Sequence, residues 1–346
     1  MSDEPQVLVN ATNGVGRLTL NRPAALHALT TRMCELMTEA LLIWRDDAAI
    51  ELVVIDHSGD RGFCAGGDIR MLAESGAGDG AAARRFFFVE YRLNELLFRY
   101  PKPVMAIMDG VTMGGGVGLS LPARYRVATE RTSFAMPETG IGLFPDVGGG
   151  WHLPRLHGQV GLWLALTGAR LRAADCLALG IATDVVESGK VEALKAAPEP
   201  ETLLTELESD PGPAPVMAHR DQIDRLFGGA SVEAIFEALA ADGSDWATAQ
   251  LATLKTKSPQ TLKVAFRQLR DGAAMQTFAA EMAVEYRLGA RIVQRRDFLE
   301  GVRAVIVEKD NAPQWSPATL AGVTDAMLDG LFAPLPPGEE WMPLPG

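Results

Sequence analysis

The sequence has few cysteine, histidine and basic residues for its length. Its three cysteines and five histidines, among 346 residues, show neither CxxC nor HExxH spacing, which argues against a disulfide framework and a zinc site. The 32 Lys and Arg residues are outnumbered by 44 Asp and Glu, giving a net charge of -12, whereas nucleic-acid binding needs a basic face. These shortages argue against a disulfide-stapled, a metal-dependent and a nucleic-acid-binding protein.

Long apolar runs and a leader segment are also missing. No hydrophobic stretch approaches the roughly 20 residues that a membrane-spanning helix needs. The opening residues, MSDEPQVLVN, lack the regions of a secretory signal and the arginine enrichment of a transit peptide. We therefore expect a cytoplasmic protein that does not bind membranes.

Strand-like and helix-like segments alternate through the first half of the chain. Two strand-like runs flank Asn13-Gly14, a dipeptide suited to a tight hairpin, and residues 33–44 have helical spacing. Short buried strands are predicted at 52–55, 104–110, 125–129 and 133–136. The repeated order of strand, glycine turn and helix predicts an α/β fold with its ligand site where strands lead into glycine-opened helices.

The second half of the chain is predicted to be mostly helical. Residues 186–216, rich in Glu, Pro and Lys, indicate a loosely constrained connector, and Ser258-Pro259 opens a long helical series. The ending, PLPPGEEWMPLPG, is typical of an extended, weakly ordered tail. We expect three parts, which are a core at 1–190, a connector with a helical insertion at 191–257, and a helical region with its tail at 258–346.

Two glycine-rich turns indicate a site that binds through backbone N–H groups. In RGFCAGGDIR (61–70) and DGVTMGGGVGLSL (109–121), adjacent glycines let a ligand approach the main chain. For the first segment alone, an ordinary strand-to-helix turn is the favoured explanation, and close helix packing explains one or two glycines of the second. Three successive glycines at a helix start are harder to explain without a ligand. Cys64, beside Phe63, is expected to be a small buried residue and not a nucleophile.

A third segment, PETGIGLFPDVGGG (137–150), places two carboxylates among glycines, prolines and large apolar side chains. Keeping a carboxylate charged in such surroundings is costly, so Glu138 and Asp146 are candidates for catalysis. Glu138 would act on a carbonyl held by the two glycine turns, or on a water beside it. Asp146 would raise the pKa of Glu138 or orient the substrate, and it is alternatively the cap of the following helix.

Together, FCAGGDIR, TMGGGVGLS and FAMPETGIGLFPDVGGG resemble the enoyl-CoA hydratase/isomerase (crotonase) superfamily, most closely its 3-hydroxyisobutyryl-CoA hydrolase branch. The similarity continues into SPQTLKVAFRQLRDG, EYRLGARIVQRRDFLEGVRAVIVEKD and Pro313-Gln314-Trp315, and so covers nearly the whole chain. The resemblance implies a crotonase-like spiral of β-β-α repeats with a C-terminal helical region. It also implies an acyl-CoA substrate and chemistry that needs neither a metal nor a further cofactor.

The resemblance assigns roles to individual residues. It implies that the N–H groups of Gly67 and Gly115 hold the thioester oxygen. Glu138 would attack the carbonyl carbon or activate water, with Asp146 and Glu90 beside the substrate. The other implied substrate contacts are Ala65, Asp68, Ile69, Arg70 and Lys309, of which Arg70 and Lys309 would lie near the phosphates or the adenine end.

One position separates the hydrolase branch from the hydratases. Hydratases use two glutamates, and the position of the first is Gly118 here, so only Glu138 is retained. The implied activity is hydrolysis of 3-hydroxyisobutyryl-CoA, an intermediate of valine breakdown, with 3-hydroxypropionyl-CoA as a close analogue. The alternatives are an enoyl-CoA hydratase or isomerase and a catalytically silent acyl-CoA-binding protein.

One segment departs from the family pattern, and the arrangement of the distal helices is open. The segment NRPAALHAL carries Ala24, Ala25 and His27 where relatives often show a lysine and an asparagine, so one coenzyme contact is expected to differ. The long distal helices either pair between subunits, giving a homo-oligomer, or fold back over their own active site.

Overall fold

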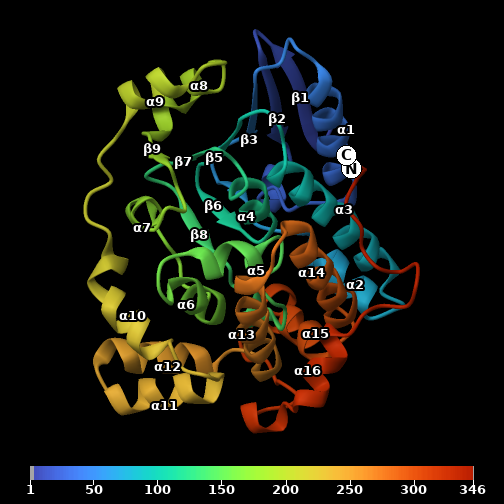
Figure 1. The fold of residues 1–346 in the computed structure, drawn as a ribbon, viewed down its shortest axis with the longest axis vertical. Helices are drawn as coiled ribbons and strands as arrows, with labels where there is room; N and C mark the ends of the chain where they lie inside the picture. Colours follow the sequence, from blue (N-terminus) through green and yellow to red (C-terminus); the bar gives the residue numbers. More distant parts are fainter. Residues whose placement is uncertain (1–3, 346) are drawn as a thin grey trace.

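Nine strands form two sheets in the computed structural model, which describes residues 4–345 (Figure 1). The larger sheet has the order β1-β2-β3-β5-β7-β9 and the smaller one the order β4-β6-β8. Only β1 and β2 pair antiparallel. The strands are β1 Val7–Thr12, β2 Val15–Leu20, β3 Leu52–His57, β4 Gly62–Cys64, β5 Val104–Met108, β6 Val111–Met113, β7 Tyr125–Ala128, β8 Ser133–Ala135 and β9 Asp184–Val185.

Sixteen α-helices surround the sheets in the described residues. The first eight are α1 Thr31–Asp46, α2 Ile69–Gly76, α3 Ala81–Phe98, α4 Gly115–Ser120, α5 Gly149–His152, α6 Val160–Thr167, α7 Ala173–Ala178 and α8 Val191–Leu194. The others are α9 Glu201–Leu207, α10 Arg220–Leu226, α11 Val232–Asp242, α12 Asp245–Lys255, α13 Pro259–Ala274, α14 Phe278–Ile292, α15 Arg296–Val302 and α16 Asp325–Phe332. None of the helices within 4–345 is long and apolar enough to cross a membrane.

Local sequence signals explain several of these boundaries. Asn13 (φ 51°) and Gly14 (φ 82°) both have positive φ, as the tight turn of the β1–β2 hairpin requires. Thr30 begins α1 by accepting a hydrogen bond from the N–H of Met33 at 3.2 Å, and Ser258 begins α13 in the same way. The predicted hairpin and both predicted helices are therefore confirmed.

The smaller sheet brings the three motif segments together. Its strands are only three residues long, and they run parallel in the order β4, β6, β8. β4 and β6 end directly before the segments 65–68 and 114–116, and β8 ends one residue short of the segment 137–146. Because parallel neighbours end at the same edge of a sheet, the three segments meet at one place.

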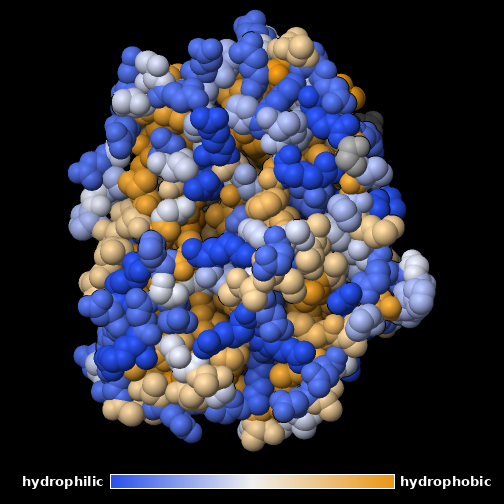
Figure 2. Space-filling view, viewed as in Figure 1, coloured by the Kyte–Doolittle hydropathy of each residue, from blue (hydrophilic) through white to orange (hydrophobic). Residues whose placement is uncertain are grey.

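The C-terminal helices fold back over the same chain. Helix α14 packs against α3 and α5, and α13 packs against α5 and α6, as the orange ribbons of Figure 1 show. Within the single chain the distal helices thus cover their own core, whereas pairing between subunits stays a prediction. Figure 2 shows polar residues spread over the visible face, with apolar residues in furrows among them.

Two segments differ from their sequence-based expectations. Within the connector expected at 186–216, residues 191–194 and 201–207 form α8 and α9 and bury Leu194 and Leu204 against the larger sheet, so this part is not loosely constrained. The tail is extended and is anchored at Trp341, which is 3% exposed and whose Nε1 donates to the carbonyl of Phe88 on α3 at 3.2 Å. The division into three parts stays a prediction.

Candidate active site

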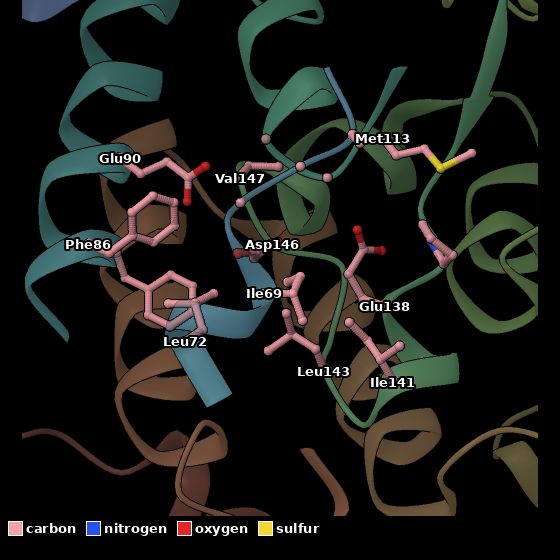
Figure 3. Close-up of a pocket in the computed structure, with 17 residues that line it drawn as sticks. Ile69, Leu72, Phe86, Glu90, Met113, Glu138, Ile141, Leu143, Asp146 and Val147 are labelled. Carbon is pink, nitrogen blue, oxygen red and sulfur yellow. The ribbon is translucent and has the colours of Figure 1, made fainter. Parts of the chain in front are cut away.

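A small cavity of about 60 Å³ lies where the strands of the smaller sheet end. Glu90 and Glu138 approach it from opposite sides, with Asp146 between them in the view of Figure 3. Apolar side chains, among them Phe86 and Leu143, form much of the remaining wall. Seven sequence-predicted residues line the cavity: Ala65, Gly67, Ile69, Glu90, Gly115, Glu138 and Asp146.

The two glycine turns touch each other at one wall of the cavity. A methyl group on Gly114 would lie 3.2 Å from the Cα of Gly66, and one on Gly66 would lie 3.7 Å from the amide nitrogen of Gly115. Gly66 and Gly114 have φ values of 109° and 46°, a region that glycine adopts at little cost. No turn or loop hydrogen bond to a backbone carbonyl is made by the N–H of Gly67 or Gly115 within residues 4–345. Both N–H groups are thus available to a ligand.

Glu138 follows β8 and lies buried next to the glycine turns. Its Oε1 would be 3.4 Å from a methyl group on Gly114, and its Oε2 has no hydrogen-bond partner among the described residues. Burial and the nearby charge of Asp146 raise the pKa of Glu138 well above its usual value, whereas the positive charge of Lys257 opposes this shift. The half-buried Lys257 lies behind the loop, with its Nζ 3.3 Å from the position of a methyl group on Gly140.

Asp146 is held by a hydrogen bond from a neighbouring helix. The hydroxyl of Tyr91, on α3, donates to its Oδ2 at 2.9 Å, and burial raises the pKa of Asp146 to about 6 although this bond opposes the shift. The alternative role of Asp146 as a helix cap is wrong. Gly148 is the N-cap of α5, and only the backbone carbonyl of Asp146 accepts a bond from that helix, from Gly149 at 2.8 Å.

Glu90 faces the second glycine turn from the middle of α3. A methyl group on Gly115 would lie 2.7 Å from its Oε1, which has no hydrogen-bond partner in residues 4–345. Burial and the charge of Asp146 raise the pKa of Glu90 well above its usual value. The cavity therefore collects three carboxyl groups whose charges compete, so that protonation of one favours ionisation of another.

Gly118, the position that the resemblance assigns to the first hydratase glutamate, has no space for a side chain. A methyl group on Gly118 would lie 2.6 Å from Cβ of Val147 and 2.7 Å from Nδ2 of Asn94. Asn94 and Val147 are both buried, so neither moves into solvent to make room. The packing thus leaves no room for a carboxylate at position 118.

Three of the predicted substrate contacts lie outside the cavity. Asp68 caps α2 through the N–H of Met71 at 3.4 Å and pairs with Arg22 at 3.2 Å. Arg70 is exposed and donates to the carbonyl of Ile306 at 3.3 Å, three residues before the exposed Lys309. Arg70 and Lys309, which are far apart in the sequence, are therefore brought towards one part of the surface.

Sequence reasoning missed Tyr91 and Lys257. Tyr91 belongs to a helical pattern that gives no sign of its hydrogen bond to Asp146, and Lys257 is one of two lysines just before the helix cap Ser258, with no motif that marks it. The expectation for Cys64 is confirmed. It is fully buried, its Sγ donates to the carbonyl of His27 at 3.3 Å, and burial raises the pKa of the thiol to about 12.

Backbone donors and buried carboxyls around a cavity on an α/β fold define a protein built for acyl chemistry. The chain belongs to the enoyl-CoA hydratase/isomerase family, whose model matches residues 15–332. It is 45% identical to "3-hydroxyisobutyryl-CoA hydrolase, mitochondrial" of Danio rerio over 344 residues, which cover 95% of this chain and 90% of the relative.

Two solved structures share the whole architecture. A carnitinyl-CoA dehydratase from Mycobacterium thermoresistibile matches with a TM-score of 0.91 and 40% identity, covering 96% of this chain and 98% of that one. An enoyl-CoA hydratase from Rhodobacter sphaeroides matches with a TM-score of 0.88 and 39% identity, covering 98% and 100%. These matches confirm the crotonase-like fold predicted from the sequence.

Proposed function

We propose that the protein hydrolyses the thioester of 3-hydroxyisobutyryl-CoA to 3-hydroxyisobutyrate and CoA, a reaction of valine breakdown. The observation that carries the proposal is the pairing of Glu138 with Asp146 in one buried cavity, beside two glycine turns and without space for a carboxylate at Gly118. The similarity to the Danio rerio hydrolase over nearly the full chain supports the same activity. The small volume of the cavity suits a short acyl group.

The reaction begins with the thioester carbonyl between the two glycine turns. The N–H groups of Gly67 and Gly115 hold the oxygen as it becomes negative, and one such donor contributes about 3 to 4 kcal/mol in other enzymes. The carboxylate of Glu138 attacks the carbonyl carbon, the C–S bond breaks, and the CoA thiolate leaves and takes a proton. Water then hydrolyses the resulting mixed anhydride. In the alternative route, Glu138 takes a proton from water, which attacks the carbonyl carbon directly.

The other polar groups bind and orient the substrate. Asp146, which Tyr91 holds in place, binds the substrate hydroxyl or positions water, and Glu90 supports this part of the site. Outside the cavity, Arg70 and Lys309 are proposed to contact the coenzyme phosphates or the adenine end. The remaining contacts proposed for the acyl-CoA are Ala65, Asp68 and Ile69.

A hydratase is the second candidate because the matching solved structures are described as an enoyl-CoA hydratase and a carnitinyl-CoA dehydratase. Addition of water to a double bond uses two carboxyl groups, and the space at Gly118 is taken by Asn94 and Val147. This packing favours the hydrolase. A catalytically silent acyl-CoA-binding protein would not need Glu138 and Asp146 together.

The deciding experiment compares two assays on the same protein. We expect free thiol to be released from 3-hydroxyisobutyryl-CoA and no loss of the enoyl absorbance of crotonyl-CoA. Loss of that absorbance without thiol release would show a hydratase, and CoA-ester binding with neither reaction would show a silent protein. A cytoplasmic location stays a prediction, whereas the name of the Danio rerio relative includes "mitochondrial".

Glu138→Gln tests the nucleophile or base directly. The amide keeps the shape of the side chain but neither attacks the thioester nor accepts a proton, so we expect thiol release to fall by about 10²- to 10⁴-fold. Steady-state kinetics measure this change, and thermal unfolding checks that the variant is folded. Full activity of Glu138→Gln would refute the role of this residue.

A further inference from the structure

The segment that carries Asp146 has an unusual backbone conformation. We call residues 145–150 the acid turn. Val147 has a φ of 54° and Gly148 a φ of 91°, and a β-branched residue such as valine rarely adopts positive φ. Such a conformation persists only where neighbouring groups hold it.

Two buried side chains of the C-terminal helices bond to the acid turn. The carboxylate of Glu285, on α14, accepts hydrogen bonds from the N–H groups of Gly148 at 2.8 Å and Gly150 at 3.1 Å. The Nε2 of Gln268, on α13, donates to the carbonyl of Pro145 at 2.9 Å and to Glu285 at 3.2 Å. Glu285 and Gln268 are fully buried, and neither lines the cavity.

We propose that Glu285 and Gln268 are positioning residues for Asp146. Their hydrogen bonds reach the backbone on both sides of Asp146 and not its carboxylate, so they act by fixing where that carboxylate lies relative to Glu138. Glu285 also provides the cap of α5 that the sequence had suggested for Asp146, because it binds the free N–H groups of the first turn. The inference rests on the proposed function, which gives Asp146 its place in the reaction.

Glu281 provides a matched control on the same helix. It lies one turn before Glu285, is equally buried and packs against Gly150, but neither of its carboxylate oxygens has a hydrogen-bond partner in residues 4–345. Glu281→Gln therefore changes the same functional group in the same buried layer without removing a bond to the acid turn, and it also removes a charge that raises the pKa of Glu285.

The first test measures kcat and KM for hydrolysis of 3-hydroxyisobutyryl-CoA. Glu285→Gln replaces one acceptor oxygen by an NH₂ group that cannot bind a backbone N–H, and Gln268→Met removes both donated bonds at similar volume. We expect each variant to lower kcat about tenfold or more, with KM changed less than about threefold, because a small displacement of a catalytic group mainly slows the chemical step. Glu281→Gln should stay within about twofold of wild type. Wild-type kcat in folded Gln268→Met and Glu285→Gln would overturn the proposal.

A double-mutant cycle separates positioning from general loss of stability. If Glu285 acts through Asp146, then adding Glu285→Gln to Asp146→Asn should lower kcat by less than about twofold further. If the two losses multiply in full, Glu285 does not act through Asp146 and the proposal fails. Gln268→Met serves in the same cycle should Glu285→Gln not fold.

Amide hydrogen exchange of peptides that cover 144–151 reports on the hydrogen bonds of Glu285 to the acid turn and does not depend on catalytic activity. We expect faster exchange in Glu285→Gln than in wild type, and no change in Glu281→Gln. Unchanged exchange in Glu285→Gln would overturn the positioning role. Absence of thiol release by the wild-type protein would instead overturn the proposed function, so the two failures are distinguishable.

Discussion

At the scale of single residues, Asp146 and Lys257 act on the same carboxyl group with opposite charge. Asp146 raises the pKa of Glu138, whereas Lys257 lowers it. Glu138 must be ionised to attack or to accept a proton, so the acid limb of the rate profile follows this pKa. The two neighbours should therefore move that limb in opposite directions.

Asp146→Asn removes the negative neighbour of Glu138. The pKa of Glu138 then falls, and we expect the acid limb of kcat/KM to move to lower pH even as the maximum rate decreases. The pH profile of thiol release measures the shift. A limb that stays in place or moves to higher pH contradicts the electrostatic coupling.

Lys257→Met has the reverse effect because it removes the positive neighbour. The pKa of Glu138 rises further, and the acid limb should move to higher pH. Lys255→Met is the control, since Lys255 is exposed on the last turn of α12 and two residues away. An equal shift in both variants would point to a change of net charge and not to a contact with Glu138.

At the scale of elements, the start of α4 illustrates how closely the glycine turn is packed. In Gly115→Ala, the new methyl group would meet Oε1 of Glu90 at 2.7 Å and Cδ1 of Leu29 at 2.8 Å, so either these two buried side chains or the turn with its N–H group must shift. We expect kcat to fall about 10²-fold or more, in line with loss of one oxyanion donor.

The control for this substitution is Gly330→Ala on α16. No atom lies within 4 Å of the corresponding methyl position, and alanine in a helix is more stable than glycine by roughly 0.5–1 kcal/mol. Thermal unfolding and kcat of both variants are compared. Equal activity of the two variants would show that the Gly115 turn tolerates a side chain and is no precise donor site.

Local elements could be predicted from the sequence, but the way in which they come together in space could not. The hairpin at Asn13-Gly14 and the glycine-opened helices depend on neighbouring residues, which the sequence displays directly. The strand predicted at 133–136 is β8, whereas the three-residue strands β4 and β6 are too short to show a pattern, although they bring the first two motifs to the same sheet. That the three motifs form one site could be predicted only from the resemblance to a known family. The hydrogen bond of Glu285 to Gly148, 137 residues away, has no signal in the neighbouring sequence.

At the scale of the whole molecule, helix α3 contacts both the cavity and the C-terminal tail. This helix carries Glu90 and Tyr91 on its cavity side, and the tail packs on it through Trp341. Arg92 of α3 also binds the tail, because its Nε donates to the carbonyl of Met342 at 2.8 Å. The tail therefore supports the helix that supplies part of the site.

Trp341→Ala tests this support. Removing a buried tryptophan costs about 3–5 kcal/mol, so we expect a clearly lower Tm. Met342→Ala should change the free energy of unfolding by less than about 0.5 kcal/mol, because Met342 is 64% exposed. If Trp341→Ala unfolds at the wild-type temperature, the tail does not contribute to the stability of α3.

The return of α13 and α14 to the core has a consequence for the order in which the protein is made. Every carboxyl group of the cavity has been synthesised once residue 146 leaves the ribosome, yet Gln268 and Glu285 follow more than a hundred residues later. A nascent chain that ends before α13 thus holds the full set of reactive groups without the scaffold that aligns them. Catalytic activity should therefore appear late in translation and abruptly, when α13 and α14 pack against the core that was synthesised first.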